Sequence, residues 1–365
     1  MDIQADLDRK KIGVINNLIP GFPRTVGKVA VNNPIWLAPM AGITFGSLRY
    51  FYKELGAGLV HTEMVSALGL CHRGRKTKEL LFGDDGERPV VLQLFGSNAE
   101  DIIKGAEIAL TIRKFEAIEI NMACPMPKVT KKGSGSKLLE NPSEAAAIIK
   151  VLKPLGLPVW SKVRIMPEWN DITTADFCGA LFESGADYVF VHGRTPAQRY
   201  EGVASRDAVE KIAAEFPGLI GGSGDCYTVS DFTDYLARGC TSVLAGRGIM
   251  KDVFIIPKVL KQLGADIPQE STDPDSEVQS ALLLKLGRSI YNAEGESLAL
   301  MVARRMLAAL FKGFPGAAQL RRRGAMVRTW ADMEELLINW RDIPSLPEVE
   351  FRPEDFPRGV IGEFN

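Results

Sequence analysis

The chain up to about residue 250 alternates between two kinds of hydrophobic pattern. Segments whose apolar residues recur every three or four positions begin with Ser, Asn or Thr, which are typical helix caps, and often end near Gly. They alternate with short, almost continuously apolar runs that we interpret as strands. The helical segments include 97–115, 141–155, 173–186, 205–216 and 228–239. The eight strand runs are 35–42, 58–65, 89–96, 117–125, 159–165, 188–194, 218–224 and 242–248.

Strands that are apolar on both faces and alternate with helices predict a parallel sheet covered by helices. Eight such units over about 220 residues fit an α/β fold of the (β/α)₈ or TIM-barrel class. A doubly wound open sheet is the alternative, and the even spacing of eight units favours the closed barrel.

The pattern changes after Met250, where the spacing predicts long helices over 278–295, 296–313 and 331–342. We therefore expect a second, smaller all-helical domain. The predicted organisation is a catalytic barrel over 1–255, a polar linker over 266–278, a helical domain over 279–342 and an irregular tail over 343–365.

Composition narrows the class of protein. The 365 residues are 46% hydrophobic and carry a formal net charge of −1, so a polyanionic partner would have to meet a local basic patch. The N-terminus has acidic residues where a signal peptide needs an apolar core, and no apolar run has transmembrane length, which predicts a cytoplasmic protein without membrane attachment. We also expect a monomer. Five scattered cysteines without a C-x-x-C pair, and only three histidines, argue against a disulfide framework or a metal centre.

Active sites of TIM barrels lie at the C-terminal ends of the strands. Taken alone, each polar residue there has an ordinary explanation, since a cysteine or histidine can be part of the core and Lys162 could pair with Glu63. Their coincidence on one rim favours an active site. The residues on this rim are Pro39, Met40, Ala41, Gly42, Glu63, Gln93, Asn121, Cys124, Lys162, Arg164, His192 and Arg194.

Strands seven and eight lead into the glycine-rich turns 221–225 (GGSGD) and 246–248 (GRG). Loops at these positions bind phosphate in this fold, and Arg247 would add charge, so we predict a phosphate-bearing cofactor. The turns lack the G-x-G-x-x-G spacing of a Rossmann site. Lys162 suits a flavin better than pyridoxal phosphate, although that lysine alone does not decide between them.

Two basic segments suggest a polyanion. Four lysines follow Cys124 in what we expect to be a flexible loop: Lys128, Lys131, Lys132 and Lys137. Seven basic residues and no acids occur between Arg304 and Arg328, including Lys312 and the run Arg321, Arg322 and Arg323. The alternative interpretation is that these residues simply face solvent. Basic residues clustered in two segments of a nearly neutral chain nevertheless favour nucleic-acid binding. Tyr200 and Trp169 are candidates for stacking on bases.

The motifs "APMAGIT", "TEMVS", "QLFGS", "EINMACP", "KVR", "VHGRTPAQRYEG", "GSGD" and "AGRG" resemble those of the tRNA-dihydrouridine synthases, most closely the bacterial B-type branch. The resemblance covers about residues 30–250 and continues more weakly through 303–322. The chain departs from the family pattern at Phe45, Ala123, Ser223 and 249–254. Phe45 replaces an Asp, Ala123 a Gly and Ser223 an Asn.

The resemblance implies reduction of the 5,6 double bond of uridine in tRNA, with FMN as cofactor and NADPH, or alternatively NADH, as reductant. Cys124 would be the general acid that protonates C5 of the uracil. Substrate contacts would come from Asn121, Arg164, Arg194, Lys128, Lys132, Arg321, Arg322 and Arg323. FMN would be bound by Pro39, Met40, Ala41, Gln93, Lys162, His192, Ser223, Gly224, Asp225, Gly246 and Arg247.

Three alternatives remain open from the sequence. The substrate could be ribosomal RNA instead of tRNA. A small-molecule pyrimidine oxidoreductase resembling dihydroorotate dehydrogenase would share the barrel but would not need the basic helical domain. An RNA-binding protein without flavin would not need Gln93, Cys124, Lys162 and His192 on one rim.

Overall fold

The computed structural model describes residues 15–166, 173–311 and 314–340. The chain forms two compact units. One comprises Ile15–Ile249 and Phe254–Ile267, and the described residues of the other are 250–253, 268–311 and 314–340. Trp169, Lys312, the first 14 residues and the tail predicted over 343–365 lie outside the described residues.

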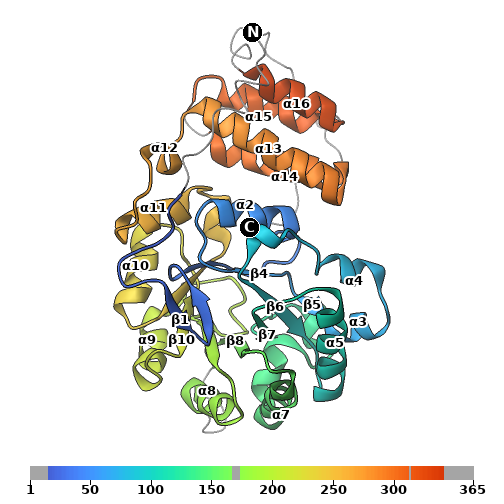
Figure 1. Ribbon diagram of the computed structural model, residues 1–365, viewed down its shortest axis with the longest axis vertical. Helices are drawn as coiled ribbons and strands as arrows, with labels where there is room; N and C mark the ends of the chain where they lie inside the picture. The colour runs from blue at the N-terminus through green and yellow to red at the C-terminus, as the bar shows by residue number, and fades with distance from the viewer. Residues whose placement is uncertain (1–14, 167–172, 312–313, 341–365) are drawn as a thin grey trace. The chain divides into compact units, whose positions relative to one another are not determined.

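The first unit is a closed parallel barrel, as predicted (Figure 1). Its strands run in the order β4-β3-β11-β10-β9-β8-β7-β6-β5, and pairing of β4 with β6 closes the ring. The predicted strand 58–65 is interrupted, so β4 and β5 together fill one barrel position. The strands are β3 Ile35–Leu37, β4 Val60–His61, β5 Val65–Ser66, β6 Val90–Phe95, β7 Ala117–Met122, β8 Val159–Arg164, β9 Tyr188–His192, β10 Ile220–Ser223 and β11 Ser242–Ala245.

Helices surround this sheet (Figure 1). The side chains of Asn98, Asn141, Thr173, Ser205 and Thr228 each accept a hydrogen bond from the first turn of the helix that follows, which confirms the cap assignments. The helices of this unit are α2 Gly46–Glu54, α3 Ala67–Cys71, α4 Arg75–Glu79, α5 Ala99–Ile112, α6 Pro127–Thr130, α7 Pro142–Leu152, α8 Thr174–Glu183, α9 Arg206–Glu215, α10 Val229–Ala237 and α11 Ile255–Gln262.

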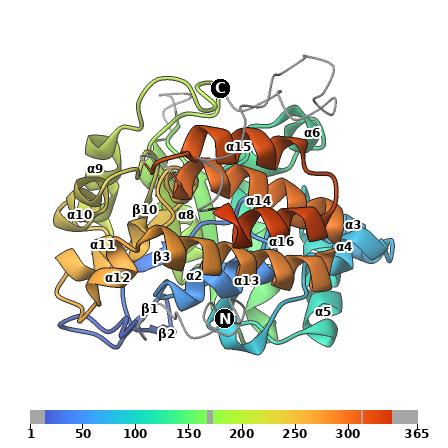
Figure 2. The ribbon, with the colours of Figure 1, turned by 90° about the horizontal axis from the view of Figure 1, so that it is seen from above.

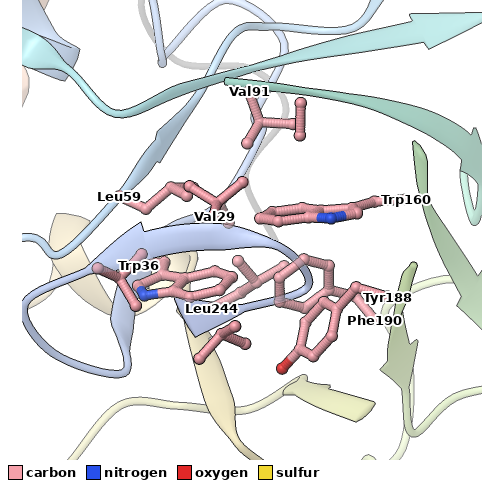
Figure 3. Packing of buried hydrophobic residues seen from close by; sticks show 12 residues of the cluster. Val29, Trp36, Leu59, Val91, Trp160, Tyr188, Phe190 and Leu244 are labelled. Carbon is pink, nitrogen blue, oxygen red and sulfur yellow. The ribbon is translucent and has the colours of Figure 1, made fainter. Parts of the chain in front are cut away.

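Aromatic and aliphatic side chains fill the N-terminal half of the barrel interior (Figure 3). Trp36 and Trp160 stack with ring centroids 5.6 Å apart. A hairpin that the sequence did not predict, β1 Arg24–Val26 and β2 Val29–Val31, packs its valines into this cluster. The Trp160 Nε1–H donates to the carbonyl oxygen of Gly27 in the hairpin turn, 2.8 Å away. The hairpin therefore closes the end of the barrel opposite the catalytic rim.

The second unit is helical, as predicted (Figure 2). Helix α13 packs against α14 and α16, and α14 packs against α15. The expected linker 266–278 is more ordered than its composition suggested, because it contains α12 and the first turn of α13. No helix among the described residues is long and apolar enough to cross a membrane. The helices are α12 Gln269–Thr272, α13 Ser276–Glu294, α14 Glu296–Leu310, α15 Ala317–Met326 and α16 Trp330–Ile338.

Candidate active site

A layer of polar side chains lies inside the barrel, between the aromatic cluster and the C-terminal ends of the strands. Gln93 on β6 links two residues of the neighbouring strand β7. Its Nε2 donates to Glu119 Oε1 at 2.5 Å, and its Oε1 accepts from Asn121 Nδ2 at 3.0 Å. All three side chains are buried, so these bonds hold the polar groups in fixed orientations. Sequence analysis identified Gln93 and Asn121 but missed Glu119 and, on β4, His61, although both interrupt apolar runs.

Asn121 also positions the cysteine. Its Oδ1 accepts from the backbone N–H of Ala123 at 3.1 Å and from that of Cys124 at 2.9 Å. Asn121 is paired in register with Lys162 on β8, so cysteine and lysine come from neighbouring strands. Cys124 is half-buried. Burial raises the pKa of its thiol, although a hydrogen bond from the Met126 backbone and the nearby Arg164 and Lys162 act in the opposite direction.

The segment after Cys124 is folded and does not form the flexible loop that its composition suggested. It contains α6 and a 3₁₀ turn over Gly135–Glu140. The N–H of Ser136 donates to the carbonyl oxygen of Cys124 at 2.9 Å, which folds the segment back on the cysteine. Lys128, Lys131 and Lys132 are exposed, whereas Lys137 forms an ion pair with Glu140 at 2.6 Å.

Lys162 is the cation at the centre of the rim. Burial lowers its pKa, and no carboxylate among the described residues lies within ion-pair distance of its ammonium group. The pairing with Glu63 that we considered does not form, because Glu63 Oε2 accepts from the N–H of Gly42 at 2.5 Å. That bond instead fixes the loop Pro39–Gly42 at the end of β3. The ammonium group of Lys162 donates no hydrogen bond to the described residues, so it is available to a ligand.

His192, at the end of β9, is 7% exposed, and its imidazole makes no hydrogen bond with the described residues. Burial lowers the pKa of its imidazole well below the usual range, and nearby cations, Lys162 first, lower it further. A neutral imidazole can both donate to and accept from a ligand. His192 and Lys162 therefore form an unsatisfied polar pair of the kind that a bound group would complete.

The ends of β10 and β11 lie side by side and present backbone donors. The N–H groups of Gly224, Asp225, Gly246 and Arg247 have no acceptor among the described residues. Gly224 has φ +120, and a Cβ there would lie 2.6 Å from the His192 ring, so the turn requires glycine. Four unused N–H groups at adjacent strand ends fit a phosphate. Ser223 is buried, and its carbonyl oxygen accepts from the hydroxyl group of Tyr235.

Three of the predicted site residues instead form hydrogen bonds and ion pairs with other parts of the protein at the border of the site. Arg194, which is 3% exposed, forms a bidentate pair with Asp225 at 2.7 and 2.8 Å. It also donates to the carbonyl oxygens of Glu201 and Gly202. Arg164 donates to the carbonyl oxygens of Ala123, Thr195 and Arg199. These contacts give both arginines and the Asp225 carboxylate structural roles, and their predicted contacts with substrate or cofactor remain predictions.

Tyr200 is 50% exposed at this border of the site. The guanidinium of Arg247 lies 4.8 Å from its ring centroid and that of Arg164 lies 5.7 Å away. The two cations hold the ring by cation–π contacts while leaving half of the side chain accessible. This geometry suits the base-stacking role that we considered for Tyr200.

In the helical unit, the basic residues divide into two groups. Arg304 donates to the carbonyl oxygens of Gly324 and Val327 at the C-terminal end of α15, so it stabilises the helix end. The run of three arginines lies on α15 itself, where the middle residue is exposed and its neighbours are partly buried: Arg321, Arg322 and Arg323.

The sequence is similar to known proteins of one named family. A family model described as "Dihydrouridine synthase (Dus)" matches residues 36–344. A protein of Synechocystis named "Probable tRNA-dihydrouridine synthase 1" is 27% identical over 332 residues, which cover 88% of this chain and 90% of that protein. A "Probable tRNA-dihydrouridine synthase" of Rhizobium leguminosarum is 31% identical and covers 82% and 92%, respectively. The "tRNA-dihydrouridine synthase B" of Pseudomonas aeruginosa is 28% identical and covers 81% and 89%.

Among solved structures, the one titled "Crystal structure of TcOYE with pHBA" aligns with a TM-score of 0.49 and 12% sequence identity. The alignment covers 70% of this chain and 96% of that chain.

Proposed function

The chain belongs to the dihydrouridine synthase family, and from this premise we propose that it reduces the 5,6 double bond of specific uridines in tRNA, using FMN and NADPH. The observation that carries the proposal is the pairing of Asn121 with Lys162 on neighbouring strands. This register brings a positioned thiol, that of Cys124, to the same rim as an ammonium group without a counter-ion. The names of the relatives support tRNA as the substrate.

The residues present fit FMN. The unused N–H groups after β10 and β11 would hold its phosphate, while Lys162, His192 and Gln93 would face its ring system. Bound FMN would supply the electrons that saturate the uracil double bond, with NADPH as their source. Lys162 would supply positive charge to a flavin ring that gains negative charge on reduction, and this ligand would satisfy its ammonium group, which has no partner among the described residues.

Cys124 would provide the proton. Reduction builds negative charge on C5 and O4 of the uracil, and a general acid must then protonate C5. The raised pKa of the thiol keeps it protonated at neutral pH, as an acid requires and a nucleophile does not. The two N–H bonds to Asn121 orient the cysteine backbone, so the thiol direction is set before substrate arrives.

The RNA would be bound through its phosphates by exposed cations. Lys128, Lys131 and Lys132 lie within eight residues of Cys124 and have no ion-pair partner among the described residues. The arginines of α15 would contribute contacts from the helical unit. Tyr200 would stack on a base that has left its helix. A target base must leave its stack to reach a barrel interior, which accounts for an accessible aromatic ring beside Arg164 and Arg247.

The test uses purified protein reconstituted with FMN and supplied with NADPH and total tRNA. We expect tRNA to gain two hydrogens at defined uridines, detected by nucleoside mass spectrometry. Cys124→Ala should lower the rate by about 10²–10⁴-fold while flavin binding and its reduction by NADPH continue. Modification of ribosomal RNA alone, or of free uracil or orotate but no RNA, would refute the tRNA assignment.

A further inference from the structure

Two buried polar atoms in the barrel interior face each other just beyond hydrogen-bond distance, and neither has a hydrogen-bond partner among the described residues. His61 Nε2 on β4 lies 3.6 Å from Glu119 Oε2 on β7, and both side chains are completely buried. The other ring nitrogen of His61, Nδ1, is 2.8 Å from the carbonyl oxygen of Leu37. A carbonyl oxygen can only accept, so Nδ1 carries the proton of the neutral ring and Nε2 is an acceptor.

This tautomer restricts the state of Glu119. An ionised carboxylate is also only an acceptor, so it would face Nε2 with no proton between them. Two buried acceptors without a donor are unfavourable, whereas one proton between them replaces their repulsion by attraction. The proton could reside on the imidazole, giving a buried ion pair, or on the carboxyl group, giving a neutral pair.

The surroundings favour the neutral pair. The ring of His61 lies 5.6 Å from that of Phe190 and 6.4 Å from that of Trp160, so it packs against aromatic groups rather than water. Burial lowers the pKa of His61 to about 3. Burial also raises the pKa of Glu119, although the hydrogen bond from Gln93 and the charge of Lys162 oppose this effect. Both shifts place the proton on the carboxyl group.

We propose that Glu119 is a positioning residue that remains a neutral acid, keeps its proton directed toward His61 Nε2, and so leaves the charge of Lys162 without a counter-ion. The inference rests on the proposed function for its consequence, since an uncompensated Lys162 would stabilise a negatively charged reduced flavin. The titratable groups that face the Glu119 carboxyl are His61 from β4 and Lys162 from β8; β6 contributes the amide of Gln93.

Glu119 also begins a chain of contacts that reaches the catalytic rim. Its Oε1 fixes the amide of Gln93, Gln93 fixes Asn121, and Asn121 holds the N–H of Cys124. The neutral acid therefore has two separate consequences. It orients Gln93, and it withholds negative charge from Lys162.

The first experiment uses protein without cofactor and compares Glu119→Gln with Glu87→Gln. A glutamine at 119 reproduces the neutral acid, because its oxygen can accept from Gln93 and its N–H can donate to His61. Glu87 is a matched buried control that is held as an anion by Arg49, with Nε 2.8 Å from Oε2, and by Arg113. Urea unfolding of both variants and the wild type is measured from pH 5 to pH 8.

The two substitutions are expected to change stability, relative to the wild type, in opposite directions as pH rises. A carboxyl group with a raised folded-state pKa contributes stability that is lost as pH rises above its unfolded-state pKa, and glutamine has no such loss. The stability of Glu119→Gln relative to the wild type should therefore increase as pH rises, by up to about tenfold in the unfolding equilibrium constant per pH unit. Glu87→Gln should lose stability throughout this range. A Glu119→Gln variant that behaves like Glu87→Gln would overturn the proposal.

A second measurement does not require the variant to fold. The chain has three histidines, so ¹⁵N-histidine NMR of the wild type is simple to interpret, with His72→Gln and His192→Gln for assignment. We expect His61 to show a protonated Nδ1 and an unprotonated Nε2 that do not titrate between pH 5 and 8. An imidazolium signal at His61 would place the negative charge on Glu119 and overturn the proposal.

A third measurement links the acid to the cofactor. With FMN bound, Glu119→Gln should leave the midpoint potential of the flavin unchanged at neutral pH, because no charge is removed. A more positive potential in the variant would show that Glu119 had been an anion. If neither protein binds FMN, the proposed function fails, yet the unfolding and NMR experiments still decide the state of Glu119.

Discussion

Gly135 controls the geometry of the segment that follows Cys124, the proposed general acid. Its φ is +62, and a Cβ at this position would lie 2.6 Å from the carbonyl oxygen of Cys124 and 2.8 Å from a methyl group of Val129. The first neighbour is backbone, so it cannot move aside without moving the cysteine. We therefore predict that Gly135→Ala displaces Cys124 or opens the segment, and that it impairs catalysis without removing a catalytic group.

Gly133 is the matched control in the same segment. Its φ is +78, but a Cβ there would meet only the Cβ of Ser97, at 3.3 Å. Both variants carry the cost of a left-handed alanine, about 1–2 kcal/mol. Gly135→Ala adds overpacking of about 1–3 kcal/mol and weakens the bond from Ser136 to Cys124, worth about 1 kcal/mol. The difference between the variants should be about 2–4 kcal/mol.

The assays are hydrogen exchange of residues 126–137 and single-turnover reduction of tRNA. Gly135→Ala should exchange faster across this segment, and its rate should fall by up to about 10²-fold, the loss expected for a displacement of about 1 Å. Gly133→Ala should retain most of its activity. Equal losses in both variants would attribute the effect to backbone strain, and full activity of Gly135→Ala would refute the reasoning.

Three further predictions follow from the same geometry. Burial raises the pKa of the Cys124 thiol, so activity in a single-turnover pH profile should persist above the pH range in which an ordinary thiol ionises. A loss of activity at or below that pH range would contradict this prediction. Replacing Lys128, Lys131 and Lys132 together by alanine should reduce the slope of log tRNA affinity against log salt concentration by about one to two units, whereas Lys137→Ala, which removes an ion-paired lysine, should change the slope less. Equal slopes for the triple variant and the wild type would exclude contacts between these three lysines and the RNA. Gly27→Ala should lower the free energy of unfolding in urea by about 2–4 kcal/mol more than Gly156→Ala, because of the two glycines only Gly27 would place a Cβ within 2.7 Å of a neighbouring atom. Equal losses of stability would show that the hairpin can adjust.

The eight positions of the barrel and the starts of its longer helices could be predicted from the chain alone. Both depend on local patterns: a buried parallel strand must be apolar on both faces, and a helix needs a capping side chain at its first turn. Asn98 and Thr228 illustrate this, because their capping bonds lie within three residues along the sequence. The hairpin at Arg24–Val31 was missed because each strand has three residues and its valines find their partners only on distant strands.

The rim of the site was also predictable, because the C-terminal ends of parallel strands must meet whichever side chains they carry. The function of each side chain on that rim was decided by tertiary contacts. Arg194 and Asp225 are separated by 30 residues and look like ligand-binding groups in sequence, yet they bind each other. Lys162 has no such partner, because Glu63 is engaged by Gly42 and Glu119 faces His61. A sequence specifies which polar groups exist and at which strand end they lie; only the folded barrel determines which of them satisfy one another and which remain available to a ligand, since that depends on distances between strands far apart in the chain.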